Sequence, residues 1–260
     1  MYPTGPCCIL DGMTDLTGKH AFITGGGTGI GLAIARSLAD AGARVTIAGR
    51  RPEALDHDGL HPAVMDVTDE DSVAGAIDAA VAARGPVAIC VANAGIAEGR
   101  SLHRTDTAFW RRMMATNLDG AFLTIRESLR SMHGLDWGRV IAVSSIAGLR
   151  GLKGAPAYTA SKHGMIGLVR ALSEDYIGTG LTFNALCPGY VRTAIVDRNV
   201  VSIRDRAGVD EDAAMRLMTD ANRHRRLIEP PEVAAAALWL CGSQSGSING
   251  QTIEISGGQT

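Results

Sequence analysis

The sequence predicts an α/β domain in which helices cover both faces of a parallel, doubly wound sheet. Short runs of β-branched and apolar residues alternate with longer segments of helical composition, which is the order of successive β-α-β units. The strand-like runs are apolar throughout instead of alternating, as expected of strands buried on both faces. A length of 260 residues suits one large domain with its own core.

Seven segments have the length and composition of strands. In chain order they are residues 20–24, 44–48, 63–67, 87–92, 139–144, 181–186 and 252–255. Because helical patterns lie between these runs, the strands are expected to lie parallel to one another in a single sheet.

Five segments have helical length and composition, and Pro231 suits the first turn of the last one. They are residues 30–41, 72–83, 108–132, 158–177 and 232–240. The stretch at 194–228 is irregular, rich in charge and methionine, and follows the sixth strand, where α/β domains commonly carry an insertion over the ligand site. We therefore expect a loose tail at 1–14 and one domain at 15–260 with a lid at about 194–228.

Composition excludes several classes of protein. With 46% hydrophobic and 20% charged residues the chain is an ordinary globular protein, and a net charge of -2 gives no basic field for nucleic acid or an anionic membrane. It has no run of 18 apolar residues and no secretory leader, so neither membrane spanning nor secretion is expected. The five cysteines lack C-x-x-C spacing, which favours reduced thiols and a cytoplasmic location. The seven histidines lack metal-ligand spacing, so no catalytic metal is expected.

A glycine-rich turn at residues 24–31 directly follows the first strand and begins the first helix. Gly25, Gly29 and Gly31 allow positive φ angles and a close approach of the backbone to a pyrophosphate at the positive end of the helix. A tight structural turn could have the same composition, but the order of strand, turn and helix favours the dinucleotide-binding turn of a Rossmann-type fold.

The end of the second strand bears on which dinucleotide binds. An acidic residue against the ribose 2′-hydroxyl would favour NAD, but here Gly49 is followed by Arg50 and Arg51. A guanidinium can pair with the 2′-phosphate of NADP, whereas a solvated surface pair is the alternative interpretation. NADP(H) is therefore favoured as the cofactor, and NAD(H) stays open.

Three polar residues suggest proton transfer. Tyr158 and Lys162 are four residues apart in a helical segment and so share one helix face. An ammonium beside a phenol favours phenolate and would lower the pKa of the tyrosine from its ordinary value of about 10. Ser145 ends the fifth strand, at the edge where open α/β sheets bind ligands, and its hydroxyl is placed to hold a reacting oxygen. Together the three side chains indicate proton exchange with a substrate oxygen.

These motifs resemble those of the short-chain dehydrogenase/reductase family, from about Asp15 to the C-terminus. The resemblance implies a Rossmann-type sheet of seven parallel strands and an NAD(P)-dependent oxidoreductase that interconverts a secondary alcohol and a ketone. It also implies a homotetramer or homodimer formed through the helices at 108–132 and 158–177. The matching pieces are Thr24-Gly25-x-x-x-Gly29-x-Gly31, Asn93-Ala94-Gly95, Asn117, Ser145, Tyr158-x-x-x-Lys162 and Pro188-Gly189.

The resemblance also implies roles for individual residues. Ser145 would orient the substrate oxygen, and Tyr158 would act as general acid or base. Lys162 would bind the nicotinamide ribose and lower the tyrosine pKa, and Asn117 would hold a water in the proton relay. Thr28 departs from the basic residue that many NADP-preferring relatives carry at its position. The residues expected around the cofactor are Gly25, Thr28, Gly29, Ile30, Gly31, Arg50, Asp66, Val67, Asn93, Gly95, Tyr158, Lys162, Pro188, Gly189, Val191 and Thr193.

The expected substrate is a small molecule in a largely apolar pocket formed by residues 146–158, Tyr190 and the lid. The loop and lid resemble those of 3-oxoacyl thioester reductases, polyketide ketoreductases and 3-hydroxyacid dehydrogenases, which implies a 3-oxoacyl or 3-hydroxyacyl compound. A steroid, a sugar or an aromatic alcohol is the alternative, because the fold does not choose among substrates. A catalytically silent nucleotide-binding sensor is more distant, since all four expected catalytic residues are present.

Overall fold

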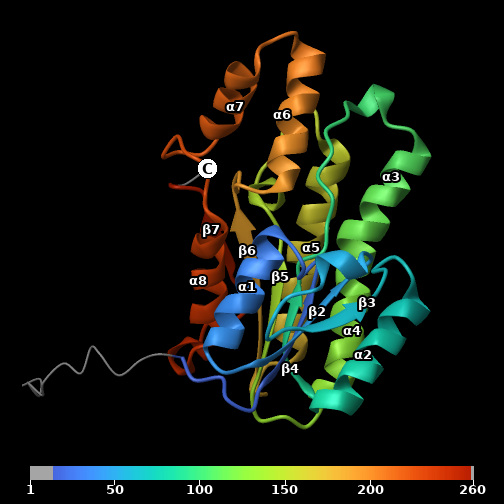
Figure 1. The fold of residues 1–260 in the computed structure, drawn as a ribbon, viewed down its shortest axis with the longest axis vertical. Helices are drawn as coiled ribbons and strands as arrows, with labels where there is room; N and C mark the ends of the chain where they lie inside the picture. Colours follow the sequence, from blue (N-terminus) through green and yellow to red (C-terminus); the bar gives the residue numbers. More distant parts are fainter. Residues whose placement is uncertain (1–13, 259–260) are drawn as a thin grey trace, which may run out of the picture.

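The computed structural model of the chain describes residues 14–258, which form one sheet of seven parallel strands in the order β3-β2-β1-β4-β5-β6-β7 (Figure 1). The predicted fold class is confirmed, whereas residues 1–13 of the expected tail lie outside the described residues. The strand order reverses between β1 and β4, and α/β sheets bind ligands at the carboxyl ends of strands beside such a point. The strands are β1 (His20–Thr24), β2 (Arg44–Gly49), β3 (His61–Val64), β4 (Val87–Ala92), β5 (Gly138–Val143), β6 (Leu181–Pro188) and β7 (Thr252–Ile255).

Helices cover both faces of the sheet: α1 and α8 pack on one face, and α2, α4 and α5 pack on the other. The five inner strands contribute to both cores; in β1, for example, Ala21 and Ile23 pack under α1 and α8 while Phe22 packs on the opposite side. Within residues 14–258, no helix has both the length and the apolar character needed to cross a membrane. The helices are α1 (Gly29–Asp40), α2 (Glu70–Arg84), α3 (Thr107–Met114), α4 (Gly120–Met132), α5 (Pro156–Asp175), α6 (Ala194–Ala207), α7 (Glu211–Thr219) and α8 (Pro230–Leu240).

Strand β3 lies two residues earlier than the sequence predicted. It is an edge strand that pairs with β2 alone, so Pro62, which has no backbone N–H, can lie within it. After Val64 the chain leaves the sheet, and Asp66 begins a turn in which its carboxylate accepts a hydrogen bond from the backbone N–H of Thr68 (2.9 Å). The predicted adenine-binding residues therefore lie in a turn and not in a strand.

The single helix predicted at 108–132 is interrupted. A π turn at Ala115–Asp119 separates α3 from α4 and contains Asn117. A π turn inserts one residue into a helix and often marks a functional site. The interruption brings Asn117 into the buried interior, where it is fully covered.

The lid, residues 194–228, is helical where an irregular segment was expected. Helix α6 ends at Gly208, which has a left-handed φ of 67°, and α7 begins at Asp210, whose carboxylate accepts a hydrogen bond from the backbone N–H of Ala213 (2.6 Å). These two caps allow two short helices to form in a segment whose composition concealed them. Beyond the end of the sheet (Figure 1), the lid has an apolar cluster of its own, formed by Val196, Val200, Ala214, Met218 and Leu227.

Candidate active site

The glycine turn has the backbone conformation that an anion site requires. Gly25 and Gly29 have positive φ angles of 63° and 56°, a region that other residues avoid. Thr28 begins α1 without a side-chain cap, and the first turn has no acidic residue, whereas aspartates cap α2, α3 and α7. The free N–H groups at the start of α1 therefore fit a dinucleotide pyrophosphate. The side chain of Ile30, also predicted in this site, packs against the core under α1.

Asn93 holds the glycine turn against β4. Its amide nitrogen donates to the carbonyls of Thr24 (2.9 Å) and Gly25 (3.2 Å), and its backbone N–H donates to the Thr24 hydroxyl (3.0 Å). A Cβ at Gly31 would collide with the Gly25 carbonyl and with this amide. Asn93 and Gly31 thus act by fixing the turn, and the Thr24 hydroxyl is a brace that the sequence did not single out.

The predicted adenosine end brings together Arg50 and Asp66. Arg50 follows β2, its side chain is 70% exposed, and its Nη1 lies 4.0 Å from an Asp66 carboxylate oxygen. Hydrogen bonds from Thr68 are the main cause that lowers the pKa of Asp66, and Arg50 adds to it. Val67 is buried and lies against Gly120 at the start of α4. An exposed guanidinium in this place fits a negatively charged group on the ribose.

Ser145 and Lys162 are buried beyond the carboxyl end of β5, and the partly buried Tyr158 lies beside them. The Lys162 ammonium lies 5.9 Å from the centroid of the Tyr158 ring and donates a hydrogen bond to the Val143 carbonyl (2.8 Å). Ser145 and Lys162 are only 7% and 4% exposed. The structure thus places a hydroxyl, a phenol and an ammonium around one point, as the spacing of the sequence predicted.

Burial governs the ionisation of this site. It raises the pKa of Tyr158, although a hydrogen bond with Ser145 acts in the opposite direction. It also lowers the pKa of Lys162 to about 8. The predicted lowering of the tyrosine pKa by Lys162 is not seen, because desolvation of the phenolate dominates and Lys162 is not among the groups that shift this pKa.

Asn117 connects the loop after β4 to helix α5 by hydrogen bonds. Its Oδ1 accepts a hydrogen bond from the backbone N–H of Ile96 (2.8 Å), and its Nδ2 donates to the Ser161 hydroxyl (3.1 Å) on α5. A Cβ at Gly95 would lie 3.1 Å from Asn117 Oδ1 and 3.7 Å from Lys162 Nζ. These three predicted residues are thus gathered at one place, and the amide of Asn117 has a bracing role that the resemblance did not include.

The end of β6 connects the site to the lid. Pro188 closes the strand, and Thr193 precedes α6, with its methyl group 3.1 Å from where a Cβ at Gly29 would lie. Asn222 holds this corner, because its Oδ1 accepts a hydrogen bond from the Tyr190 N–H (2.9 Å) and would block any side chain at Gly189. Asn222 lies in the lid, far along the chain and outside any motif, so the sequence did not reveal it. Figure 1 places this corner where the orange lid meets the sheet.

The two ends of the lid also meet at this corner. Val191 and Ile228 form a parallel β-bridge, and the Arg192 N–H donates to the Ile228 carbonyl (2.8 Å). The predicted nicotinamide-end residues therefore lie next to both the start of α1 and the base of the lid.

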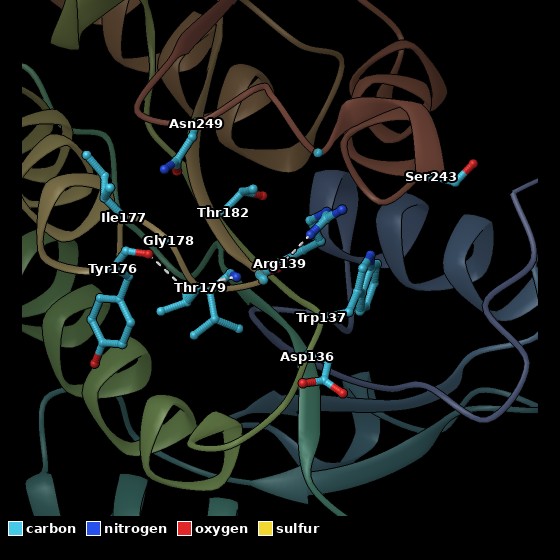
Figure 2. Close-up of a pocket in the computed structure, with 13 residues that line it drawn as sticks. Asp136, Trp137, Arg139, Tyr176, Ile177, Gly178, Thr179, Thr182, Ser243 and Asn249 are labelled. Carbon is cyan, nitrogen blue, oxygen red and sulfur yellow. Dashed lines mark hydrogen bonds between the residues drawn. The ribbon is translucent and has the colours of Figure 1, made fainter.

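A cavity of about 480 Å³ lies at the opposite end of the sheet, where β5 and β6 begin (Figure 2). The buried guanidinium of Arg139 lines it, donating from Nε to the Leu240 carbonyl (3.0 Å) and from Nη1 to the Gly138 carbonyl (2.9 Å). The same guanidinium stacks 4.5 Å from the Trp137 ring. Its hydrogen bonds are satisfied by the protein, and no predicted site residue lines this cavity.

A family model described as short chain dehydrogenase matches residues 19–202. The chain belongs to the short chain dehydrogenase family. This short chain dehydrogenase is 37% identical to cis-4-hydroxycyclohexanecarboxylate dehydrogenase of Sinomonas cyclohexanicum, over 93% of the chain and 96% of that protein. It is 33% identical to D-beta-hydroxybutyrate dehydrogenase of Rhizobium meliloti, over 93% of the chain and 98% of that protein.

Among solved structures, a variant of actinorhodin polyketide ketoreductase with NADPH is similar, with a TM-score of 0.89, 30% identity, and coverage of 92% of this chain and 96% of that one. As a member of its family, this short chain dehydrogenase is an NAD(P)-dependent oxidoreductase that acts on the CH–OH group of a small-molecule alcohol, or on the corresponding ketone.

Proposed function

We propose that this dehydrogenase interconverts a 3-hydroxyacyl and a 3-oxoacyl compound, or a close analogue. The gathering of a hydroxyl, a phenol and an ammonium at the carboxyl end of β5 carries the proposal. A relative that is named for a hydroxybutyrate supports the substrate class. The proposed catalytic residues are Asn117, Ser145, Tyr158 and Lys162.

Tyr158, Ser145 and Lys162 have different roles in the proposed proton transfer. A raised pKa keeps the Tyr158 phenol protonated at neutral pH, so it can donate its proton to a ketone oxygen during reduction. The Ser145 hydroxyl donates a hydrogen bond to the same oxygen and fixes its position. Lys162, with a pKa of about 8, is mostly protonated at neutral pH and stabilises negative charge as it develops on the phenol. The bound nicotinamide dinucleotide would supply or accept the hydride.

The residues that hold the cofactor follow from the same geometry. The glycine turn and the start of α1 would hold the pyrophosphate, and the corner from Pro188 to Thr193 would border the nicotinamide. At the adenosine end, Asp66 and Val67 would border the adenine and Arg50 would pair with a 2′-phosphate, which favours NADP(H) over NAD(H).

The preference for NADP(H) depends on one exposed arginine. We expect Arg50→Ala to weaken NADPH binding about tenfold or more while leaving NADH binding unchanged, because the variant removes a charged hydrogen bond to a group that NADH lacks. Fluorescence titration with both nucleotides measures this. Arg51→Ala, a neighbouring exposed arginine, is the control, and equal losses for both nucleotides in the Arg50 variant would remove Arg50 from cofactor selection.

The reaction itself is tested by a substrate panel. Purified protein is titrated with NADPH and NADH and then assayed with 3-oxoacyl thioesters, 3-hydroxy acids, sugars, aromatic alcohols and steroids. Turnover of a 3-oxoacyl or 3-hydroxyacyl compound supports the proposal. Turnover of a steroid or sugar alone would show that the proposed substrate class is wrong and that the steroid or sugar takes its place. Binding of a nucleotide with no turnover of any compound would reject the proposal and favour a silent sensor.

We also propose that the chain forms a homotetramer or homodimer through α4 and α5. These helices present a groove of about 610 Å³ with apolar residues that include Leu129, Leu168 and Tyr176, and the side chain of Phe122 beside them is 42% exposed. An exposed apolar groove of this kind is stabilised when a second copy covers it. Size-exclusion chromatography with light scattering measures the state, and a monomer would contradict the proposal.

A further inference from the structure

Arg150 lies one turn beyond Ser145, in the loop that leads to Tyr158. Ser145 caps the short helical turn η4 (Ile146–Gly148), accepting a hydrogen bond from the Ala147 N–H (3.1 Å). The backbone N–H of Arg150 donates to the Ile146 carbonyl (3.0 Å), so the arginine continues this turn directly from the catalytic serine. Its side chain therefore begins at the rim of the active site.

Within the part of the chain that the structure describes, the guanidinium of Arg150 is unpaired. Its Nε is buried without a hydrogen bond, and the group makes neither a hydrogen bond nor an ion pair with the described part of the chain. Arg139 shows the alternative within the same protein, since its buried guanidinium donates to backbone carbonyls and stacks on Trp137. A buried donor without an acceptor is costly, so Arg150 is arranged for an acceptor that comes from outside the chain.

Arg150 is close enough to Tyr190 for their charges to interact. Its charge lowers the pKa of Tyr190 against the effect of burial, and Tyr190 in turn acts on the phenol of Tyr158. Tyr190 lies at the base of the lid, where it packs against the lid cluster. Tyr190 thus interacts electrostatically with both groups: with the phenol of Tyr158 and with the unpaired guanidinium of Arg150.

We propose that Arg150 binds a carboxylate of the substrate, so that this dehydrogenase acts on a free hydroxy acid or oxo acid and not on a thioester or a neutral ketone. The inference rests on the proposed function and narrows its substrate class. A guanidinium presents two parallel N–H donors that match a carboxylate, and Leu149 and Leu152 on either side of it in the loop are half-buried.

One arginine of the lid is occupied within the chain and so is not available to a rival thioester. A coenzyme A thioester carries phosphates, and Arg226 in the basic run at 223–226 of the lid would be one residue to meet them. Arg226 is instead held by Glu232, with both carboxylate oxygens at 2.6 and 2.7 Å. One unpaired guanidinium fits a single carboxylate better than a group with several phosphates.

Matched acids and esters test the inference. The substrates are 3-hydroxybutyrate and 4-hydroxycyclohexanecarboxylate, each assayed beside its methyl ester, with Arg150→Ala, Arg150→Lys and the wild-type protein. The control is Lys153→Ala, which removes an exposed cation from the same loop. Nucleotide titration of every variant checks that the site has folded.

We expect the wild-type protein to prefer the acids. Arg150→Ala should raise KM for an acid about 10- to 100-fold, because the variant loses a charged hydrogen bond to the carboxylate. The KM for the corresponding ester should change little. Arg150→Lys should recover part of the loss, and Lys153→Ala should behave as wild type. Equal effects of Arg150→Ala on acid and ester, or a wild-type preference for the ester, would overturn the role of Arg150 while leaving the proposed function intact. No turnover of any acid, ester or other compound would overturn both.

Discussion

The glycine turn after β1 and the lid after β6 meet at the same end of the sheet, yet they are held in opposite ways. In the turn, backbone meets backbone: a Cβ at Gly31 would collide with the Gly25 carbonyl, and a Cβ at Gly27 with the Ala54 carbonyl. In the lid, the glycine that joins the two helices, Gly208, has open space around it, and a small apolar cluster provides the packing. The glycine turn is therefore specified by steric exclusion, and the lid by a core that other side chains could fill.

Tyr158→Phe has the largest expected effect, because it removes the proposed proton donor without changing the glycine turn or the lid. The change removes one hydroxyl and leaves both regions intact. We expect kcat to fall about 10²- to 10⁴-fold, the usual contribution of a general acid or base, while nucleotide affinity stays unchanged. Steady-state kinetics and fluorescence titration measure the two quantities. Turnover within tenfold of wild type would reject Tyr158 as the proton donor.

A pair of glycine variants compares the two regions directly. Gly31→Ala should lower the free energy of unfolding by about 3 kcal/mol and abolish nucleotide binding, because the added methyl group meets backbone. Gly208→Ala should cost only about 1 kcal/mol, the strain of a left-handed φ of 67°, and leave nucleotide affinity unchanged. Urea unfolding and titration with NADPH give both values. If the two variants lost equal stability and equal affinity, the contrast drawn between turn and lid would be wrong.

A further expected effect concerns buried Lys162 and depends on pH. Its pKa is lowered to about 8 from an ordinary value of 10.5, so between these values the unfolded chain binds more protons than the folded one. In the cofactor-free protein this group therefore adds about 1.5 kcal/mol to the free energy of unfolding as the pH rises from about 8 to about 9.5. The raised pKa of Tyr158 places its titration above this window.

Urea unfolding at several pH values, comparing wild type with Lys162→Met, isolates that contribution. The Met variant should lack the rise, and Lys153→Met, which changes an exposed lysine, should retain it. Parallel pH curves for wild type and Lys162→Met would show that the ammonium is not desolvated as the structure indicates.

The sequence predicted most of the sheet, because strands buried on both faces are written as unbroken apolar runs such as the one containing Phe22. The convergence of Ser145, Tyr158 and Lys162 was also predictable, since strand ends and helix spacing fix their positions. Edge strand β3 was misplaced by two residues because an edge tolerates Pro62 and has weaker apolar patterning.

Other features are invisible in a single sequence. The π turn at Asn117 changes the helix period by one residue without any special residue type. The raised pKa of Tyr158 reflects burial, which depends on how distant elements pack. Asn222 and Arg150 act through partners that are distant in the chain or absent from it, so no local spacing marks them.

The bridge between Val191 and Ile228 has an evolutionary consequence. It brings the two ends of the lid together, so the lid is an insertion that leaves the sheet and returns to it at one point. The entropy of closing such an insertion grows slowly with its length, so residues can be gained or lost between the two anchors at little cost to the sheet. The lid can therefore change in length and sequence during evolution while the sheet and the glycine turn keep their structure.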